Sequence, residues 1–272
     1  MDNRPIGFFD SGLGGLTCIP HLMETLPNER IIYFGDTART PYGSKAVSTI
    51  KTFSCEIADF LESENVKLIV IACNTVSATC LDDLRKRHPN TPILGIISPA
   101  SHTVAKRCNA DNRIGIIGTT VTIESDAYRR KILRYNPDLD IYSAACPVFV
   151  PLIEEGIIKN EIMDLSIKYY LDQFISYNKI DTLVLGCTHY PLIRENILKI
   201  YPHLDIIDPS SEVLQSIMDT LDSRGLYADA PQEGNTFFAS DLSENFINMI
   251  NLIFRNTGFT VAFKNFDLER TV

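Results

Sequence analysis

The segment Lys67-Leu-Ile-Val-Ile-Ala-Cys-Asn-Thr75 has a counterpart further along the chain, Asp181-Thr-Leu-Val-Leu-Gly-Cys-Thr-His189. Each consists of an apolar run, a small residue, a cysteine and then polar residues. Such apolar runs are typical of parallel strands buried on both faces, and the polar residues are typical of a helix start. The pair predicts two related α/β lobes, each with one cysteine at the C-terminal end of a strand. Open α/β sheets bind their ligands at that edge.

The remainder of the chain continues this alternation of short β-rich runs and longer segments of helical period. The alternation predicts parallel sheets covered by helices. Strands are expected at residues 5–10, 30–35, 67–72, 92–97, 113–118, 140–144, 182–186, 205–207, 236–239 and 259–263. Helices are expected near residues 15–26, 45–63, 76–88, 122–135, 160–177, 191–201, 210–224 and 243–255. We therefore predict an α/β fold of two related parallel-sheet lobes, with the ligand site in the cleft between them.

The amino-acid composition and net charge limit which class of protein this is and which partners it can bind. The 272 residues are 45% hydrophobic and 22% charged, as in soluble globular proteins of one large or two modest domains. The net charge is −9 and no basic cluster occurs, so we expect no nucleic-acid partner. No apolar run reaches transmembrane length, and the first residues lack a signal-peptide pattern. We therefore expect no membrane association and a cytoplasmic location.

Seven cysteines are present, an odd number, and no Cys-x-x-Cys pair occurs. This spacing fits neither a disulfide framework nor a zinc site, so no metal is expected. Most of the thiols are interpreted as small buried hydrophobic side chains. These are Cys18, Cys55, Cys80, Cys108 and Cys146. Cys73 and Cys187 differ, because a packing residue does not need the polar residues that follow them.

The acid/base chemistry of Cys73 and Cys187 depends on the groups that surround each thiol. A thiol has an ordinary pKa of about 8.5, which a helix N-terminus or a cation lowers. His189 lies two residues beyond Cys187 and can exchange a proton with it, and Asp10 is the carboxylate expected beside Cys73. Inverting a carbon centre requires removing a proton from one face and returning one to the other. Two thiols on opposite sides of a substrate can do this.

Polar residues follow several other strands, at Asp10–Gly15, Gly35–Gly43 and Gly118–Thr122. Free backbone N–H groups at helix starts there favour a bound carboxylate, and Asp10 is a possible partner for an ammonium group.

Each of these signals also has a structural interpretation. The glycines at 12, 14 and 15 do not complete a dinucleotide-binding fingerprint and can form a tight turn. Asp36, Thr119, Thr120 and Thr122 can be helix caps. Judged by spacing, Glu154 and its neighbour form a solvated acidic pair at a helix start.

Six segments together resemble the bacterial glutamate racemases, a family of the aspartate/glutamate racemase superfamily. They occur in that family's order and cover roughly the first 190 residues. The segments are Ile6–Leu16, Tyr33–Gly43, Ala72–Ala78, Gly118–Ser125, Phe149–Glu155 and Leu185–Leu192. The resemblance implies cofactor-independent interconversion of L- and D-glutamate, which supplies D-glutamate for peptidoglycan, by an enzyme that is often a homodimer. It also implies a first lobe of residues 1–97 plus 209–272 and a second lobe of residues 98–208.

The resemblance also implies roles for individual residues. Cys73 and Cys187 are the two acid/base groups. Asp10 assists Cys73, while His189 and Glu154 assist Cys187, which overrides the spacing-based interpretation of Glu154. The glutamate site comprises Asp10, Ser11, Pro41, Tyr42, Gly43, Asn74, Thr75, Thr119, Thr122, Thr188 and His189. Some relatives carry an N-terminal extension linked to control by a cell-wall precursor; here a strand begins near Met1, so we expect that control to be absent.

Three other functions remain open. The first is a racemase of aspartate, hydantoins or another α-carbon substrate with the same two cysteines. The second is a binding protein on this fold that has lost catalysis, against which the presence of both Cys73 and Cys187 argues. The third is a thiol redox protein, although neither cysteine has a resolving partner nearby in sequence.

Overall fold

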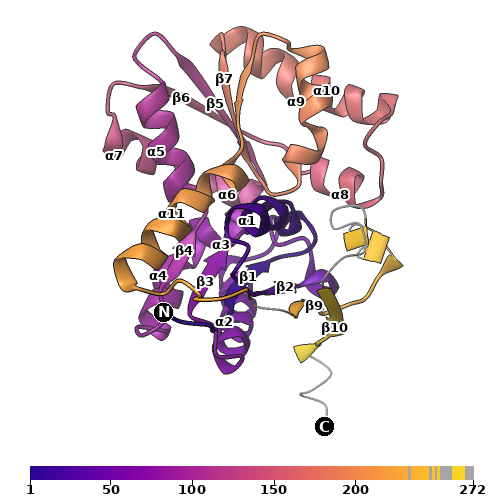
Figure 1. Cartoon of the computed structure of the whole chain (residues 1–272). Helices are drawn as coiled ribbons and strands as arrows, with labels where there is room; N and C mark the ends of the chain where they lie inside the picture. Colours follow the sequence, from indigo (N-terminus) through magenta and orange to yellow (C-terminus); the bar gives the residue numbers. More distant parts are fainter. Residues whose placement is uncertain (232–233, 245–246, 249, 252–258, 267–272) are drawn as a thin grey trace.

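The computed structural model describes residues 1–231, 234–244, 247–248, 250–251 and 259–266. Its strands form two sheets, one of six strands and one of four, and all the paired strands run parallel. Helices pack around both sheets (Figure 1). The predicted α/β fold with two parallel sheets is confirmed.

The six-stranded sheet has the order β10-β9-β2-β1-β3-β4. Its strands are β1 (Ile6–Asp10), β2 (Ile31–Gly35), β3 (Leu68–Ile71), β4 (Ile93–Gly95), β9 (Asn235–Ala239) and β10 (Phe259–Phe263). The four-stranded sheet has the order β6-β5-β7-β8. Its strands are β5 (Arg113–Gly118), β6 (Asp140–Ala145), β7 (Thr182–Gly186) and β8 (Asp205–Ile207). The strands that precede the two cysteines, β3 and β7, lie inside their sheets and are fully buried, as their apolar sequences predict.

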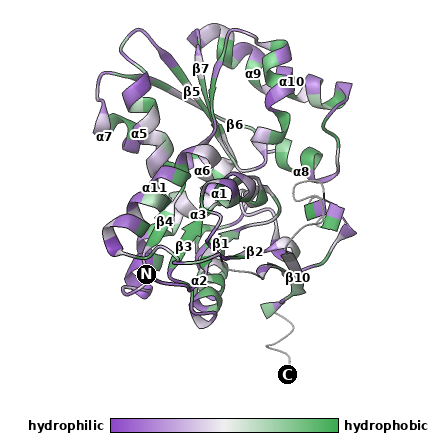
Figure 2. Cartoon of the chain, in the orientation of Figure 1, coloured by the Kyte–Doolittle hydropathy of each residue, from purple (hydrophilic) through white to green (hydrophobic). Residues whose placement is uncertain are grey.

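The helices and 3-10 turns follow the strands in regular alternation. In chain order they are η1 (Gly14–Cys18), α1 (Ile19–Thr25), η2 (Thr37–Arg39), α2 (Val47–Ser63), α3 (Asn74–Thr79), α4 (Leu81–Arg87), α5 (Ile97–Arg107), α6 (Thr120–Glu124), α7 (Ala127–Tyr135), α8 (Phe149–Glu154), α9 (Glu161–Asn178), η3 (Tyr190–Ile193), α10 (Arg194–Ile200) and α11 (Pro209–Arg224). Several of these helices alternate between hydrophobic and hydrophilic residues along their length, as expected where one face is buried (Figure 2).

Two helices link the sheets. The chain passes from the six-stranded sheet to the four-stranded sheet through α5 and returns through α11, and these helices pack against each other (Figure 1). One buried hydrophobic cluster joins both parts, since it contains Phe8 and Tyr33 of the first sheet and Ile116 and Val184 of the second. The strand ends of the two sheets are therefore held in a common arrangement.

Local sequence explains where the long helices begin and end. The Asn160 side chain caps α9 by accepting hydrogen bonds from the backbone N–H groups of Ile162 and Met163. Asp208 caps α11 in the same way, and Pro209 occupies the first turn, where its missing N–H costs nothing. Gly225 ends α11 in the left-handed region at φ 63°.

The structure differs from the sequence-based expectations in several places, including the unexpected helix α8 and the division of the helix expected near 122–135 into α6 and α7. Helix α5 was not expected, because Ser98-Pro99 and the hydroxyl residues after it are typical of a loop; Pro99 falls in the first turn, where no N–H donor is needed. The helix expected near 76–88 is divided at Cys80, which ends α3 and precedes α4. The helix expected near 243–255 lies partly outside the described residues.

Candidate active site

Cys73 lies where the polypeptide leaves the first sheet. It occupies the N-cap position of α3, two residues after β3 ends, and is 4% exposed. Its thiol donates to Ser11 Oγ at 3.5 Å. Ser11 follows β1, which pairs with β3 in parallel, so adjacent strand ends bring the two side chains together.

Asp10 connects the first sheet to the second. Its carboxylate is fully buried and accepts a hydrogen bond from the backbone N–H of Gly15 at 3.0 Å. The other oxygen accepts from the Thr188 hydroxyl at 3.4 Å, and Thr188 directly follows Cys187. The carboxylate that sequence reasoning assigned to Cys73 therefore also contacts the loop that carries the other cysteine.

Cys187, His189 and Glu154 form a chain of polar contacts at the end of the second sheet. Cys187 directly follows β7, and its sulfur lies 3.8 Å from Nδ1 of His189. Nε2 of His189 lies 3.1 Å from Oε1 of Glu154, and the Thr40 hydroxyl donates to that same oxygen at 3.3 Å. Glu154 is the last residue of α8, so the expectation of an acidic pair at a helix start was wrong.

Burial and these contacts shift the titration of three groups. Burial raises the pKa of the Cys73 thiol to about 12, and the charge of Asp10 adds to that effect. Burial also raises the pKa of Asp10, against the opposing influence of His189. For His189, burial alone lowers the pKa, but the contacts with Cys187 and Glu154 outweigh it and raise the pKa to about 10. At neutral pH the site therefore holds a Cys73 thiol and a His189 cation.

Three threonine hydroxyls from both sheets meet in one cluster. Thr75 of α3 lies 3.0 Å from Thr119 and 3.1 Å from Thr122 between hydroxyl oxygens. Thr119 also caps α6, since its hydroxyl accepts from the backbone N–H of Thr122, which confirms the interpretation of Thr119 as a cap. The cluster offers several hydrogen-bond donors within a buried space.

Residues 40–43 form a loop that reaches the second sheet. The Thr40–Pro41 peptide bond is cis. The O of Gly43 accepts from the backbone N–H of Val121 at 3.1 Å. A Cβ on Gly43 would clash with the Thr119 side chain, so glycine is required for this close approach.

Tyr42 and Asp36 form part of a second buried network. The Tyr42 hydroxyl donates to Asp36, which also accepts from Arg39 at 2.8 Å and from the Ser240 hydroxyl at 2.7 Å. Asp36 occupies the N-cap position of η2, as expected, but its side chain makes no capping hydrogen bond there. The Asp36 carboxylate instead fixes the loop that carries Tyr42.

Sequence reasoning missed Thr40, which contacts Glu154, and Tyr128, which contacts Asn74. Thr40 lies in the segment Tyr33–Gly43, after a predicted strand and before a predicted helix. A polar residue in that position could have been predicted to belong to the site. Tyr128 lies in the first turn of the amphipathic helix α7, and nothing in its sequence neighbourhood sets it apart.

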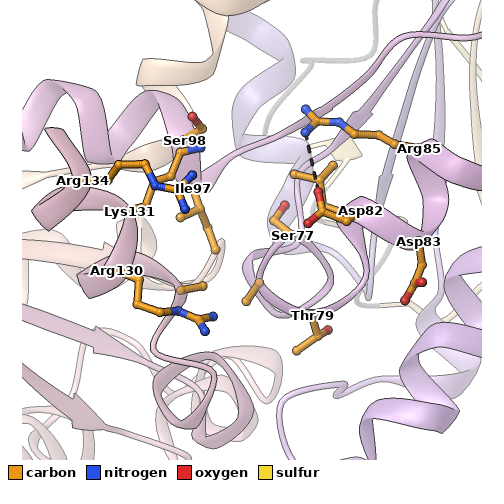
Figure 3. A pocket seen from close by; sticks show the side chains of 13 residues that line it. Ser77, Thr79, Asp82, Asp83, Arg85, Ile97, Ser98, Arg130, Lys131 and Arg134 are labelled. Carbon is orange, nitrogen blue, oxygen red and sulfur yellow. Dashed lines mark ion pairs between the residues drawn. The ribbon is translucent and has the colours of Figure 1, made fainter. Parts of the chain in front are cut away.

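A cavity of about 450 Å³ lies between α3 and α4 on one side and α5 and α7 on the other. Basic side chains of α7, Arg130, Lys131 and Arg134, face a wall that carries Asp82 and Arg85 (Figure 3). None of the residues predicted to bind substrate lines this cavity. Among the described residues, no group of three or more His, Cys, Asp or Glu side chains could hold a metal ion, and no helix is long and apolar enough to span a membrane.

Comparison with known proteins agrees with this arrangement. Residues 17–217 match the model of the Asp/Glu/Hydantoin racemase family. The chain belongs to this family. It is thus an isomerase of the amino-acid racemase class, as its sequence resemblance implies.

Individual relatives extend the match over most of the chain. A glutamate racemase of Sulfurihydrogenibium sp. (strain YO3AOP1) is 46% identical, covering 78% of this chain and 81% of that protein. A glutamate racemase of Neisseria meningitidis serogroup B is 43% identical, covering 89% of this chain and 90% of that protein. The crystal structure of the Francisella tularensis glutamate racemase in complex with D-glutamate is 38% identical, with a TM-score of 0.90, over 99% of this chain and 100% of that one.

Proposed function

We propose that this racemase interconverts L- and D-glutamate without a cofactor, using Cys73 and Cys187 as its two acid/base groups. The observation that carries the proposal is the similarity to the Francisella tularensis enzyme in complex with D-glutamate, at a TM-score of 0.90 over nearly the whole chain. The buried thiols at corresponding strand ends of the two sheets supply the chemistry that such a reaction requires.

The proposed reaction moves one proton off the α-carbon and another onto it. A thiolate on one face takes the α-proton, and the C–H electron pair remains on the substrate, delocalised into the α-carboxylate. The thiol on the opposite face then gives its proton to the same carbon. In the free enzyme Cys73 carries the thiol proton, because burial and Asp10 raise its pKa to about 12. Cys187 acts as the first base, beside the protonated His189 at 3.8 Å.

The reverse direction requires Cys73 to lose its proton. Asp10 is the group that couples this step to substrate binding. A substrate ammonium beside the buried Asp10 carboxylate offsets the negative charge that raises the pKa of Cys73. Asp10 thus serves as the ammonium partner and as the group that tunes Cys73.

The remaining proposed substrate contacts are polar groups around these thiols. Hydroxyls and backbone N–H groups at the starts of α3 and α6 bind the two carboxylates, since helix starts present free donors there. The proposed set is Asp10, Ser11, Pro41, Tyr42, Gly43, Asn74, Thr75, Thr119, Thr122, Thr188 and His189. The Tyr42 hydroxyl already donates to Asp36, so Tyr42 shapes the site through its ring and backbone.

The first experiment follows proton exchange and chirality together. The purified protein is incubated with L-glutamate in deuterated water, and with D-glutamate in parallel, while optical rotation and α-deuterium are recorded. We expect racemisation with deuterium at the α-carbon of the product. If neither rotation nor exchange occurs with either enantiomer, the glutamate assignment fails, and aspartate and hydantoins are tested in the same assay.

We also propose the lobe division into residues 1–97 plus 209–272 and residues 98–208. Its boundaries fall at the starts of α5 and α11, the two helices that connect the sheets. Because substrate contacts come from both lobes, small rotations about these connections would open and close the site.

Two further parts of the proposal concern the cellular setting. The cytoplasm fits a chain whose seven cysteines are all free. A role in supplying D-glutamate for peptidoglycan rests on the family resemblance, and predicts that loss of the gene makes growth depend on added D-glutamate.

A homodimer is proposed from the same resemblance. The outer face of α9 offers a suitable apolar surface, since Leu165, Tyr169 and Tyr177 are 64%, 81% and 87% exposed. A closed two-fold pair would bury the same face of both copies. Light scattering of the wild-type protein and of Tyr169→Glu tests this, with a monomeric wild type as the contradicting outcome.

A further inference from the structure

Tyr128 is a buried polar residue that contacts the segments around both cysteines. It lies on α7 and is 3% exposed. Its hydroxyl donates to Oδ1 of Asn74 at 2.5 Å, and Asn74 directly follows Cys73. The bond therefore runs from a helix of the second sheet to the first residue of α3.

The ring of Tyr128 reaches the other cysteine segment. A Cβ placed on Gly186 would lie 3.3 Å from the ring edge of Tyr128, and Gly186 directly precedes Cys187. The charge of Cys187 is among the influences that raise the pKa of Tyr128, after burial and Asp208. Tyr128 thus keeps its proton and remains a hydrogen-bond donor across the physiological pH range.

Asn74 has one end of its amide satisfied and the other end free. It is 4% exposed, and within the described part of the chain its Nδ2 has no hydrogen-bond partner. A buried amide donor without a partner costs free energy unless a ligand or water satisfies it. Since Oδ1 is engaged by Tyr128, the NH₂ group is the end left available for an acceptor.

Building on the proposed function, we propose that Tyr128 is a positioning residue for glutamate binding, which holds the Asn74 amide so that Nδ2 donates to a substrate carboxylate. A carboxylate is an acceptor only and matches an NH₂ donor. Without the Tyr128 hydroxyl, the amide is free to rotate, and the acceptor oxygen can face the substrate carboxylate instead. Tyr128 therefore determines which end of Asn74 the substrate meets.

The same two helices continue away from the site. Helices α3 and α7, which meet at Asn74 and Tyr128, then form opposite walls of the cavity that holds Arg130 and Thr79 (Figure 3). The packing of α3 against α7 is thus fixed at its buried end by the Tyr128–Asn74 bond.

The test compares Tyr128→Phe with a matched control. Tyr201→Phe removes a hydroxyl that also donates to a side-chain oxygen at 2.5 Å, that of Asp172, beside Asp181 at the opposite end of β7 from Cys187. We expect Tyr128→Phe to raise KM for both enantiomers about tenfold, with kcat changed less than about threefold. Tyr201→Phe should leave both constants unchanged. Thermal unfolding of both variants reports whether they fold.

A double-mutant cycle separates positioning from a general structural effect. In an Asn74→Ala background, Tyr128→Phe should raise KM no further, because the amide it orients is gone. An unchanged KM in Tyr128→Phe, a loss confined to kcat, or the same increase with and without Asn74 would overturn the proposal.

Two alternative experiments apply if Tyr128→Phe does not fold or if the wild type does not racemise glutamate. If Tyr128→Phe does not fold, Asn74→Asp keeps an acceptor for Tyr128 but removes the donor, and an unchanged KM there overturns the proposal. If the wild type does not racemise glutamate, the proposed function fails first, and the same cycle is run on whichever family substrate the wild type accepts.

Discussion

The imidazole of His189 lies between Glu154 and Cys187, with Nε2 3.1 Å from the carboxylate and Nδ1 3.8 Å from the sulfur. The three residues come from two different segments that follow strands β6 and β7. Because His189 is 3% exposed, water contributes little to stabilising its charge, and these two neighbours do so instead. The protonation of His189 therefore depends on Cys187 first and on Glu154 as well.

This relationship predicts the alkaline behaviour of the enzyme. Since the pKa of His189 is raised to about 10, the cationic form persists up to that pH, and kcat/KM should fall as pH rises through about 10. Glu154→Gln removes the negative charge and should move this fall to lower pH by about one unit. Profiles of kcat/KM against pH test this, with the exposed neighbour Glu155→Gln as control. A profile identical in wild type and Glu154→Gln would contradict the prediction.

If Cys73 and Cys187 are the two acid/base groups, as proposed, replacing either one should abolish racemisation in both directions. Cys73→Ala and Cys187→Ala each leave one face of the α-carbon without a proton carrier, so turnover should fall by about a thousandfold or more. Cys108→Ala is the matched control, because Cys108 is also buried but ends α5, away from the site. Chiral analysis of the product from each enantiomer measures the effect. Substantial turnover by either catalytic variant would argue against two-base chemistry.

Local sequence signals sufficed to predict the two parallel sheets and the strands that carry Cys73 and Cys187. Apolar runs of strand length followed by polar residues can be recognised without knowledge of distant contacts. Helix α5 escaped prediction because Pro99 and its hydroxyl neighbours are typical of loops, and packing against α11 overrides that preference.

The contacts within the candidate site could be predicted only in part. The proximity of His189 to Cys187 follows from their spacing in the chain. The contact of Thr188 with Asp10, and that of Tyr128 with Asn74, depend on how the two sheets are packed together. Periodicity and propensity carry no information about that packing, so such bonds appear only in the structure.

The buried carboxylate of Asp36 should be important for stability. Asp36→Asn removes the charge that pairs with the buried Arg39, and weakens the bonds from Tyr42 and Ser240. We expect a loss of about 2 kcal/mol in the free energy of unfolding, because the buried Arg39 cation loses one of its carboxylate partners while its pair with Glu56 at 2.6 Å remains. Asp205→Asn breaks a half-exposed pair and should cost less than about 1 kcal/mol. Urea unfolding measures both, and equal losses would contradict the role assigned to Asp36.

Gly14 sets how closely the first strand-end loop approaches the second cysteine segment. A Cβ at Gly14 would lie 2.8 Å from the backbone carbonyl carbon of Thr188 and 2.8 Å from Nδ1 of His189. Because backbone cannot yield as a flexible side chain can, Gly14→Ala should displace the 187–189 segment. We expect a loss of stability of about 2 kcal/mol and a fall in kcat/KM, since the His189–Cys187 contact moves with that segment.

Gly225→Ala is the control: its φ of 63° strains an added side chain, but no atom lies within 4 Å of the new Cβ. Gly225→Ala should therefore lower stability by about 1 kcal/mol while leaving kcat/KM intact. If Gly14→Ala loses only stability and keeps its kcat/KM, the close approach is a packing feature and the position of His189 does not depend on it.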